Sequence, residues 1–289
     1  MPSLSFDLTA TTALVTGGTS GIGLAIVEAL LDAGANVATG SRTPEKVDAA
    51  RRQLAEGRDA KRLLVGELDV ADPLSFEQLL GETVKRFGRV DVLVNNAGTN
   101  LKKPTIEVEA DEHRRLFDIN YFGPFAASQA FCRAIARQNE ATCGQAMPED
   151  ASRRIGQGGF GGCIVNVCSV TSFLALSEVT TYAATKGALL ALTRQLAVEW
   201  PRQYGIRVNA IAPGFIPADQ NRQILKSGDR GRRILENTPM QRFGSPEEIA
   251  AAVVYLASDA GRFVNGECIN IDGGFMIHGV SDATPMDAG

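Results

Sequence analysis

The chain has 289 residues, 44% of them hydrophobic and 21% charged, and a formal net charge of −4 at pH 7. This is the composition of an ordinary globular protein, and it lacks the basic footprint that nucleic-acid binding requires. No stretch has the roughly 18 uninterrupted apolar residues of a membrane span, and the first ten residues lack a signal-peptide pattern. We therefore expect a cytoplasmic protein that acts on neither nucleic acids nor membranes.

The five cysteines and two histidines form no recognisable metal or disulfide pattern. None of the cysteines belongs to a CxxC pair, and His113 and His278 are far apart in the sequence. Thiols of cytoplasmic proteins stay reduced. We therefore expect structural, reduced cysteines and no metal centre.

Apolar, β-branched runs alternate along the chain with amphipathic stretches. The runs predict strands at Thr12–Thr16, Asn36–Gly40, Arg62–Leu68, Val90–Asn95, Gly162–Cys168, Arg207–Ala212 and Glu267–Ile271. The stretches predict helices near Gly21–Ala33, Pro44–Ala55, Pro73–Phe87, Asp111–Arg137, Tyr182–Trp200 and Pro246–Ala257. Strands that are apolar on both faces and alternate with helices are typical of a parallel sheet with helices on both faces. With no internal repeat and no second core, we expect a single α/β domain over residues 1–289.

Two stretches interrupt the alternation. Gln138–Gly161 is polar and ends in a glycine-rich run, which favours an exposed, mobile insertion before the fifth strand. A solvated loop is the simplest interpretation, and a lid or a subunit contact is the alternative. Phe215–Arg242 follows the sixth strand. Because ligands of open parallel sheets bind beyond the carboxyl ends of the strands, this segment is a candidate substrate cover.

Three glycines follow the first strand and open a helix. Gly17, Gly21 and Gly23 have the spacing GxxxGxG rather than the commoner GxGxxG. Glycines at such a turn let the backbone approach a pyrophosphate, which the free N–H groups of the helix amino end then bind. The turn therefore predicts a dinucleotide cradle, and the alternative is a glycine-rich turn that only packs.

The ends of the second and third strands bear on the choice of cofactor. An acidic residue after the second strand would bind a ribose hydroxyl, whereas an arginine accommodates a 2′-phosphate. This chain has Ser41 and Arg42 there, so we favour NADP(H) over NAD(H), the alternative being that Arg42 is only solvated. Asp69 and Val70 follow the third strand. The Asp69 carboxylate is a candidate acceptor for the adenine amino group or a cap for the next helix.

The fourth strand ends in Asn95-Asn96-Ala97-Gly98. Small residues at this position allow the backbone to line a cofactor cleft.

Tyr182 and Lys186 are four residues apart within a predicted helix and so share one face. A free phenol has a pKa of about 10, and a nearby ammonium lowers that pKa. Such a tyrosine can give a proton to a carbonyl oxygen or remove one from an alcohol. A lone YxxxK pair is nevertheless common on surface helices.

Ser169 and Asn120 complete the set of polar candidates. Ser169 lies just past the fifth strand, where its hydroxyl can hold a substrate oxygen beside the phenol. Asn120 lies within a helical pattern that it does not favour, and it is a candidate anchor for a water molecule that relays protons to Lys186. For either residue alone, a local hydrogen bond to the backbone is the plainer interpretation.

Taken together, these motifs resemble the short-chain dehydrogenase/reductase family. The resemblance runs from about Phe6 to Phe275 and includes Thr16–Gly23, Asn95–Gly98, Pro213-Gly214 and Asp272-Gly273-Gly274. It implies a Rossmann-type, doubly wound, seven-stranded parallel sheet and a homotetramer or homodimer. It also implies that Tyr182 is the acid/base, that Lys186 lowers its pKa and binds the nicotinamide ribose, that Ser169 orients the substrate and that Asn120 holds the relay water. The cofactor-binding residues implied are Gly17, Thr19, Ser20, Gly21, Ile22, Gly23, Ser41, Arg42, Asp69, Val70, Asn96, Ala97, Gly98, Tyr182, Lys186, Pro213, Gly214 and Ile216.

The chain departs from the family pattern in two respects. NADP-preferring members often carry a basic residue in the glycine turn, where this chain has Thr19 and Ser20. Cys168 stands where serine is usual, next to the catalytic position, and we expect little effect from it.

The segments around Phe215 and Arg242 resemble the sugar-acid branch, whose members act as fructuronate/mannonate or gluconate 5-dehydrogenases. Arg222, Lys102 and Lys103 are candidate partners for a substrate carboxylate, unless they are only solvated loop charges. We expect an NADP(H)-dependent enzyme that transfers hydride between nicotinamide and the carbonyl or secondary alcohol of a small molecule. The alternatives are a 3-oxoacyl-thioester reductase and, in another class, a non-catalytic NADPH-binding sensor.

Overall fold

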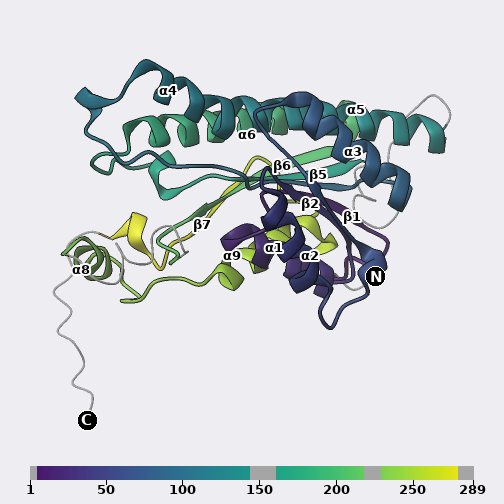
Figure 1. The fold of residues 1–289 in the computed structure, drawn as a ribbon, viewed down its shortest axis with the longest axis horizontal. Coiled ribbons are helices and arrows are strands. Elements are labelled where there is room, and N and C mark those ends of the chain that lie inside the picture. Colours follow the sequence, from purple (N-terminus) through teal and green to yellow (C-terminus); the bar gives the residue numbers. More distant parts are fainter. Residues whose placement is uncertain (1–4, 144–160, 218–228, 279–289) are drawn as a thin grey trace, which may run out of the picture.

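The computed structural model describes residues 5–143, 161–217 and 229–278. Seven parallel strands form one sheet in the order β3-β2-β1-β4-β5-β6-β7 (Figure 1). Their bounds are β1 Thr12–Thr16, β2 Asn36–Ser41, β3 Leu63–Glu67, β4 Val92–Asn95, β5 Gly162–Val167, β6 Ile206–Pro213 and β7 Cys268–Ile271. The doubly wound α/β fold expected from the sequence is confirmed, and each strand lies within two residues of its predicted bounds.

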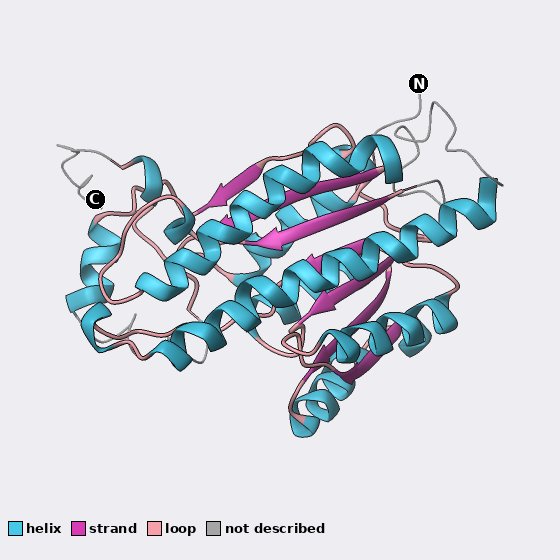
Figure 2. Cartoon of the chain, turned by 90° about the horizontal axis from the view of Figure 1, so that it is seen from above, coloured by secondary structure: helices cyan, strands magenta, loops and turns pink. Residues whose placement is uncertain are grey.

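Helices cover both faces of the sheet (Figures 1 and 2). Their bounds are α1 Gly21–Asp32, α2 Pro44–Ala55, α3 Pro73–Phe87, α4 Ala110–Phe117, α5 Gly123–Cys143, α6 Thr180–Tyr204, α8 Asp229–Glu236 and α9 Pro246–Ala257. One apolar core lies between the sheet and α1, α2 and α9, and a second lies between the opposite face and α3, α5 and α6. Burial on both faces explains why the central strands read as continuous apolar runs.

The strand order reverses between β1 and β4. β1 pairs with β2 on one side and with β4 on the other. The chain that leaves the carboxyl end of β1 and the chain that leaves the carboxyl end of β4 therefore run to opposite faces of the sheet. This divergence leaves a crevice beyond the strand ends, and the glycine turn after β1 and the run Asn95–Gly98 after β4 both meet there.

The fourth predicted helix differs from expectation in two ways. The periodicity predicted a single helix over Asp111–Arg137, whereas α4 and α5 are separated by a π-helical turn at Asp118–Phe122. In addition, α5 continues to Cys143, into the stretch predicted to be a mobile insertion. The amide of Gln138 explains the extension, because it bonds both the N–H and the carbonyl of Val90, at 2.8 and 2.9 Å. Residues 144–160 of the predicted insertion lie outside the described residues.

Within the described ranges, no helix combines the length and the apolar character that crossing a membrane requires.

Candidate active site

The glycine turn after β1 is shaped to admit a ligand closely. Gly17 and Gly21 have φ values of +67° and +54°, a left-handed conformation that favours glycine. A side chain at Gly23 would collide with the carbonyl oxygen of Gly17 and the amide of Asn96. The turn runs through Thr19 and Ser20 into α1, whose first helical residues include Ile22. Its backbone N–H groups and the positive end of the helix dipole therefore suit a pyrophosphate.

The run after β4 is bonded directly to this turn. The Asn96 side chain donates to the carbonyl oxygens of Thr16 and Gly17, at 2.9 and 3.1 Å. The hydroxyl of Thr16 accepts the backbone N–H groups of Asn96 and Ala97, both at 3.0 Å. The two walls of the crevice are thus one rigid unit, and the residues present fit a dinucleotide.

The residues predicted to select the cofactor lie at the adjacent strand ends. Ser41 is the last residue of β2, and the Arg42 guanidinium approaches the Asp69 carboxylate to 4.0 Å, with both side chains half-exposed. Asp72, rather than Asp69, caps α3 by accepting the N–H of Leu74 at 3.0 Å. The capping alternative for Asp69 is therefore wrong. Its carboxylate accepts the N–H of Ala71 at 3.0 Å, across Val70, and remains half-exposed beside Arg42.

Asn120 is fully buried in the π-helical turn and holds three elements together. Its oxygen accepts the N–H of Thr99 at 2.9 Å, and its nitrogen donates to the carbonyl of Thr99 at 2.9 Å and the hydroxyl of Thr185 at 3.1 Å. A Cβ at Gly98 would lie 3.2 Å from the Asn120 oxygen and 3.6 Å from Lys186 Nζ. Asn120 therefore joins the loop after β4 to α6 beside Lys186.

Ser169, Tyr182 and Lys186 converge at the carboxyl end of β5. Ser169 begins a 3-10 turn over Val170–Ser172 and shares a side-chain hydrogen bond with Tyr182. Lys186 donates from Nζ to the carbonyl oxygen of Val167 at 2.6 Å, and Nζ lies 5.7 Å from the centroid of the Tyr182 ring. The four candidate catalytic residues are thus assembled in one buried cluster next to the cofactor crevice.

The electrostatics of this cluster differ from the expectation. Burial raises the pKa of Tyr182, and the hydrogen bond with Ser169 opposes that rise without cancelling it. Burial likewise lowers the pKa of Lys186. The net direction of the Tyr182 pKa is therefore opposite to the lowered pKa expected from its spacing to Lys186. The ammonium is directed to the Val167 carbonyl, and the desolvation of the phenol dominates.

Comparison with known proteins decides the family. The family model described as Enoyl-(Acyl carrier protein) reductase, a branch of the short-chain dehydrogenases, matches residues 17–276. The chain belongs to the short-chain dehydrogenase/reductase family. It is 32% identical to 2-dehydro-3-deoxy-D-gluconate 5-dehydrogenase from Dickeya dadantii, over 94% of this chain and 98% of that enzyme. It is 35% identical to D-threitol dehydrogenase from Mycolicibacterium smegmatis, over 95% of this chain and 97% of that enzyme.

A solved structure extends the likeness to the fold. The gluconate 5-dehydrogenase from Burkholderia cenocepacia, in complex with NADP and tartrate, superposes with a TM-score of 0.81 at 33% identity. The match covers 94% of this chain and 97% of that one. This short-chain dehydrogenase/reductase is therefore an oxidoreductase that uses a nicotinamide cofactor and a small-molecule substrate.

The cations considered for a substrate carboxylate are largely engaged. Lys102 pairs with Glu178 at 3.3 Å, and Lys103 pairs with Glu112 at 2.9 Å. Arg222 lies outside the described residues. The charge of each lysine is thus already balanced by a carboxylate of the protein.

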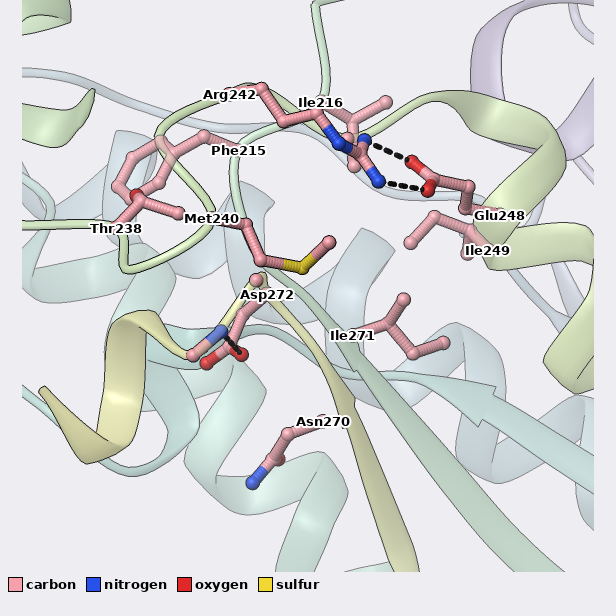
Figure 3. Close-up of a pocket in the computed structure, with 13 residues that line it drawn as sticks. Phe215, Ile216, Thr238, Met240, Arg242, Glu248, Ile249, Asn270, Ile271 and Asp272 are labelled. Carbon is pink, nitrogen blue, oxygen red and sulfur yellow. Dashed lines mark hydrogen bonds and ion pairs between the residues drawn. The ribbon is translucent and has the colours of Figure 1, made fainter. Parts of the chain in front are cut away.

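A pocket of about 460 Å³ lies between the segment after β6 and the end of β7 (Figure 3). Phe215 and Ile216 line it, following Pro213 and Gly214 of the predicted cofactor set. A Cβ at Gly214 would lie 2.7 Å from the Asp272 backbone, so the chain passes β7 closely here. The predicted substrate cover returns to this place, because the N–H of Gly244 donates to the Phe215 carbonyl at 3.1 Å.

The return is fixed by an ion pair at the rim of the pocket. Arg242 donates to both oxygens of Glu248, at 2.9 and 2.6 Å, as Figure 3 shows. The guanidinium holds the pKa of Glu248 at about 2. Arg242 therefore offers little free charge to an acidic partner.

Sequence reasoning missed the residues that support the site. Thr16 anchors the Asn96-Ala97 wall, and Thr99 and Thr185 anchor Asn120. Thr16 opens the glycine motif, so its position was a usable signal. The contacts of Thr99 and Thr185 depend on chain segments far apart in sequence, which local patterns do not reveal.

Proposed function

We propose that this chain is an NADP(H)-preferring enzyme that interconverts a carbonyl and a secondary alcohol on a sugar acid or polyol. The observation that carries this proposal is the convergence of Ser169, Tyr182 and Lys186 beside the glycine turn. The similarity to D-threitol, 2-dehydro-3-deoxy-D-gluconate and gluconate dehydrogenases supports a polyhydroxylated substrate.

In this proposal Tyr182 gives a proton to the carbonyl oxygen during reduction and takes it back during oxidation. Ser169 holds the same oxygen beside the phenol. Asn120 anchors a water molecule that relays protons toward Lys186, which also binds the nicotinamide ribose. The bound nicotinamide supplies the hydride chemistry, and the residues around it position the substrate and exclude water.

The preference for NADP(H) rests on the end of β2. Arg42 is half-exposed and its nearest carboxylate, that of Asp69, is 4.0 Å away, so the guanidinium can turn to a 2′-phosphate. With Ser41 beside it, this corner contains donors where an NAD-preferring site would carry an acid.

We further propose a homotetramer or homodimer in the cytoplasm. Phe122, which ends the π-helical turn, and Phe125, at the start of α5, expose 55% and 36% of their surfaces. Apolar exposure of this kind supports a subunit contact. Four cysteines have free thiols, as is usual in the reducing cytoplasm: Cys132, Cys163, Cys168 and Cys268. Light scattering coupled to size-exclusion chromatography measures the assembly directly.

The function is tested by following NADPH and NADH oxidation with a panel of keto sugars, keto acids and 3-oxoacyl thioesters, and the reverse reaction with polyols and sugar acids. We expect turnover of polyhydroxylated substrates and faster turnover with NADPH.

The thioester alternative has the support of the family description, whereas the pairing of Arg242 with Glu248 argues against a basic docking patch. Exclusive turnover of thioesters, or none at all, would overturn the proposal.

A further inference from the structure

Glu178 has a backbone conformation that its side chain disfavours. Its φ is +66°, in the left-handed region where glycine is preferred. It lies four residues before Tyr182 and directly before Val179, which precedes α6. A non-glycine residue held in this region costs conformational free energy, and such residues cluster at functional sites.

Contacts with the loop after β4 hold Glu178 in place. Its carbonyl oxygen accepts the N–H of Lys103 at 2.8 Å, and its carboxylate lies 3.3 Å from Lys102 Nζ. Two residues further along each loop, the hydroxyls of Thr105 and Thr180 are 2.6 Å apart. The loop after β4 and the loop between Ser169 and Tyr182 are therefore joined at successive positions.

These joined loops border the catalytic cluster. The loop after β4 passes Asn120 and Lys186 at Gly98 and reaches Lys102 four residues later. The other loop runs from Ser169 to Val179, just before α6, and carries Glu178. The side chains of Lys102 and Glu178 are 42% and 43% exposed, so both are accessible from outside the protein.

The charges around the pair favour neutral groups over anions. The carboxylate of Glu178 already compensates Lys102, and Lys103 is paired with Glu112. Glu107 and Glu109 also lie close enough to act on the Lys103 ammonium. These four carboxylates thus outnumber the two ammonium groups. The carboxylate of a bound sugar acid would therefore be repelled by negative charge that the two lysines do not neutralise.

We propose that Lys102 and Glu178 form a specificity-determining pair that binds hydroxyl groups of the substrate away from the reacting carbon. The carboxylate accepts hydrogen bonds from hydroxyls and the ammonium donates one, so the pair selects a neutral polyol or keto sugar over the corresponding sugar acid. This inference rests on the proposed function and narrows its substrate class.

The test compares substrates with the same carbon skeleton, in which a terminal hydroxymethyl group of the polyol is replaced by a carboxylate in the acid: D-glucitol with D-gluconate, xylitol with xylonate, and threitol with threonate. For each pair, kcat/KM is measured with NADP⁺ for the wild-type chain and for Glu178→Gln and Lys102→Gln. We expect the wild type to favour the polyol. Glu178→Gln frees Lys102 and should raise the acid-to-polyol ratio at least about tenfold, roughly the effect of one charged hydrogen bond. Lys102→Gln should lower it.

Two further variants separate the effect of the Glu178 charge from the effect of its backbone conformation and from the effect of removing any surface carboxylate. Glu178→Gly removes the carboxylate and relaxes the left-handed backbone, so it should shift the ratio as Glu178→Gln does while raising thermal stability. Asp111→Asn removes a carboxylate from an exposed pair with Arg114 and should leave the ratio unchanged.

Wild-type turnover with a ratio that Glu178→Gln leaves unchanged, or lowers, would overturn the role of the pair and leave the proposed function standing. Absence of wild-type turnover on every polyol, sugar acid and keto sugar would overturn the proposed function itself and, with it, this assignment.

Discussion

Lys186 donates a hydrogen bond from Nζ to the carbonyl oxygen of Val167 across 2.6 Å. This bond ties the second turn of α6 to the end of β5, two residues before Ser169. It places the ammonium beneath the Tyr182 ring, 5.7 Å from the ring centroid. The lysine is thus held by the sheet, and the sheet determines where its charge lies relative to the phenol and to the cofactor crevice.

Replacing Lys186 with methionine should reduce kcat/KM by about 100-fold or more, the lower range of losses when proton-transfer machinery is removed. The same change should weaken NADPH binding, measured by fluorescence titration, since Lys186 is the proposed ribose ligand. Arg202→Met, which removes an exposed cation near the end of the same helix, should change neither quantity. Wild-type turnover in the Lys186 variant would remove this residue from the mechanism.

The raised pKa of Tyr182 has a defined consequence for pH dependence. A phenol with a pKa above its ordinary value of 10 stays protonated from neutral to strongly alkaline pH. The proton donor for reduction is then present throughout that range, whereas the phenolate needed for oxidation increases as pH rises. A difference titration of phenolate absorbance, wild type minus Tyr182→Phe without cofactor, should place the Tyr182 step above pH 10. A step near neutrality would show that the charge of Lys186 outweighs burial.

Removing the Asn120 side chain should damage both stability and activity. Asn120→Ala leaves the N–H and carbonyl of Thr99 without their buried partner, at a cost of about 2 kcal/mol in the free energy of unfolding. The loop after β4 would also lose its link to α6, so kcat should fall. Asn139→Ala is the matched control, because Asn139 bonds Tyr204 and Gly161 near the C-terminal end of α5. Asn139→Ala should lose a similar free energy of unfolding in urea denaturation and keep the wild-type kcat. If both variants lose kcat equally, the loss in Asn120→Ala reflects reduced stability and not a role in the active site.

Replacing Arg42 with alanine should reverse or abolish the preference for NADPH. A charged hydrogen bond to phosphate is worth about 1.5–3 kcal/mol, which corresponds to roughly 10- to 100-fold in the ratio of kcat/KM for NADPH over NADH. Arg52→Ala, an exposed arginine on α2, should leave the ratio unchanged. If Arg42→Ala also leaves it unchanged, Arg42 is a solvated residue and the cofactor preference has another origin.

The fold was predictable from the sequence because its signals are local and strong. The buried strand Thr12–Thr16 and the helix Pro44–Ala55 have the same bounds in sequence and structure. A continuous apolar run determines the strand, and a periodic pattern that begins with a proline determines the helix. The glycine turn and the spacing of Tyr182 and Lys186 likewise pointed to the site.

The features that escaped prediction depend on long-range contacts. The π-helical turn at Asp118–Phe122 accompanies the bonds of Asn120 to Thr99 and Thr185, which are 21 and 65 residues away in sequence. The continuation of α5 past Arg137 depends on Gln138 bonding Val90, 48 residues earlier. The left-handed backbone of Glu178 opposes its intrinsic preference and exists because the loop after β4 bonds it. The direction in which the Tyr182 pKa shifts depends on how deeply the phenol is buried. The four-residue spacing between Tyr182 and Lys186 carries no information about burial.

The most direct test of the central claim is turnover by Tyr182→Phe, with Tyr204→Phe on the same helix as control. If Tyr182 is the proton-transfer group of a nicotinamide-dependent reaction, Tyr182→Phe should lose about 10²- to 10⁴-fold in kcat and bind NADPH as the wild type does. Tyr204→Phe should retain full activity. Wild-type kcat in the Tyr182 variant, with either direction of the reaction, would contradict the account.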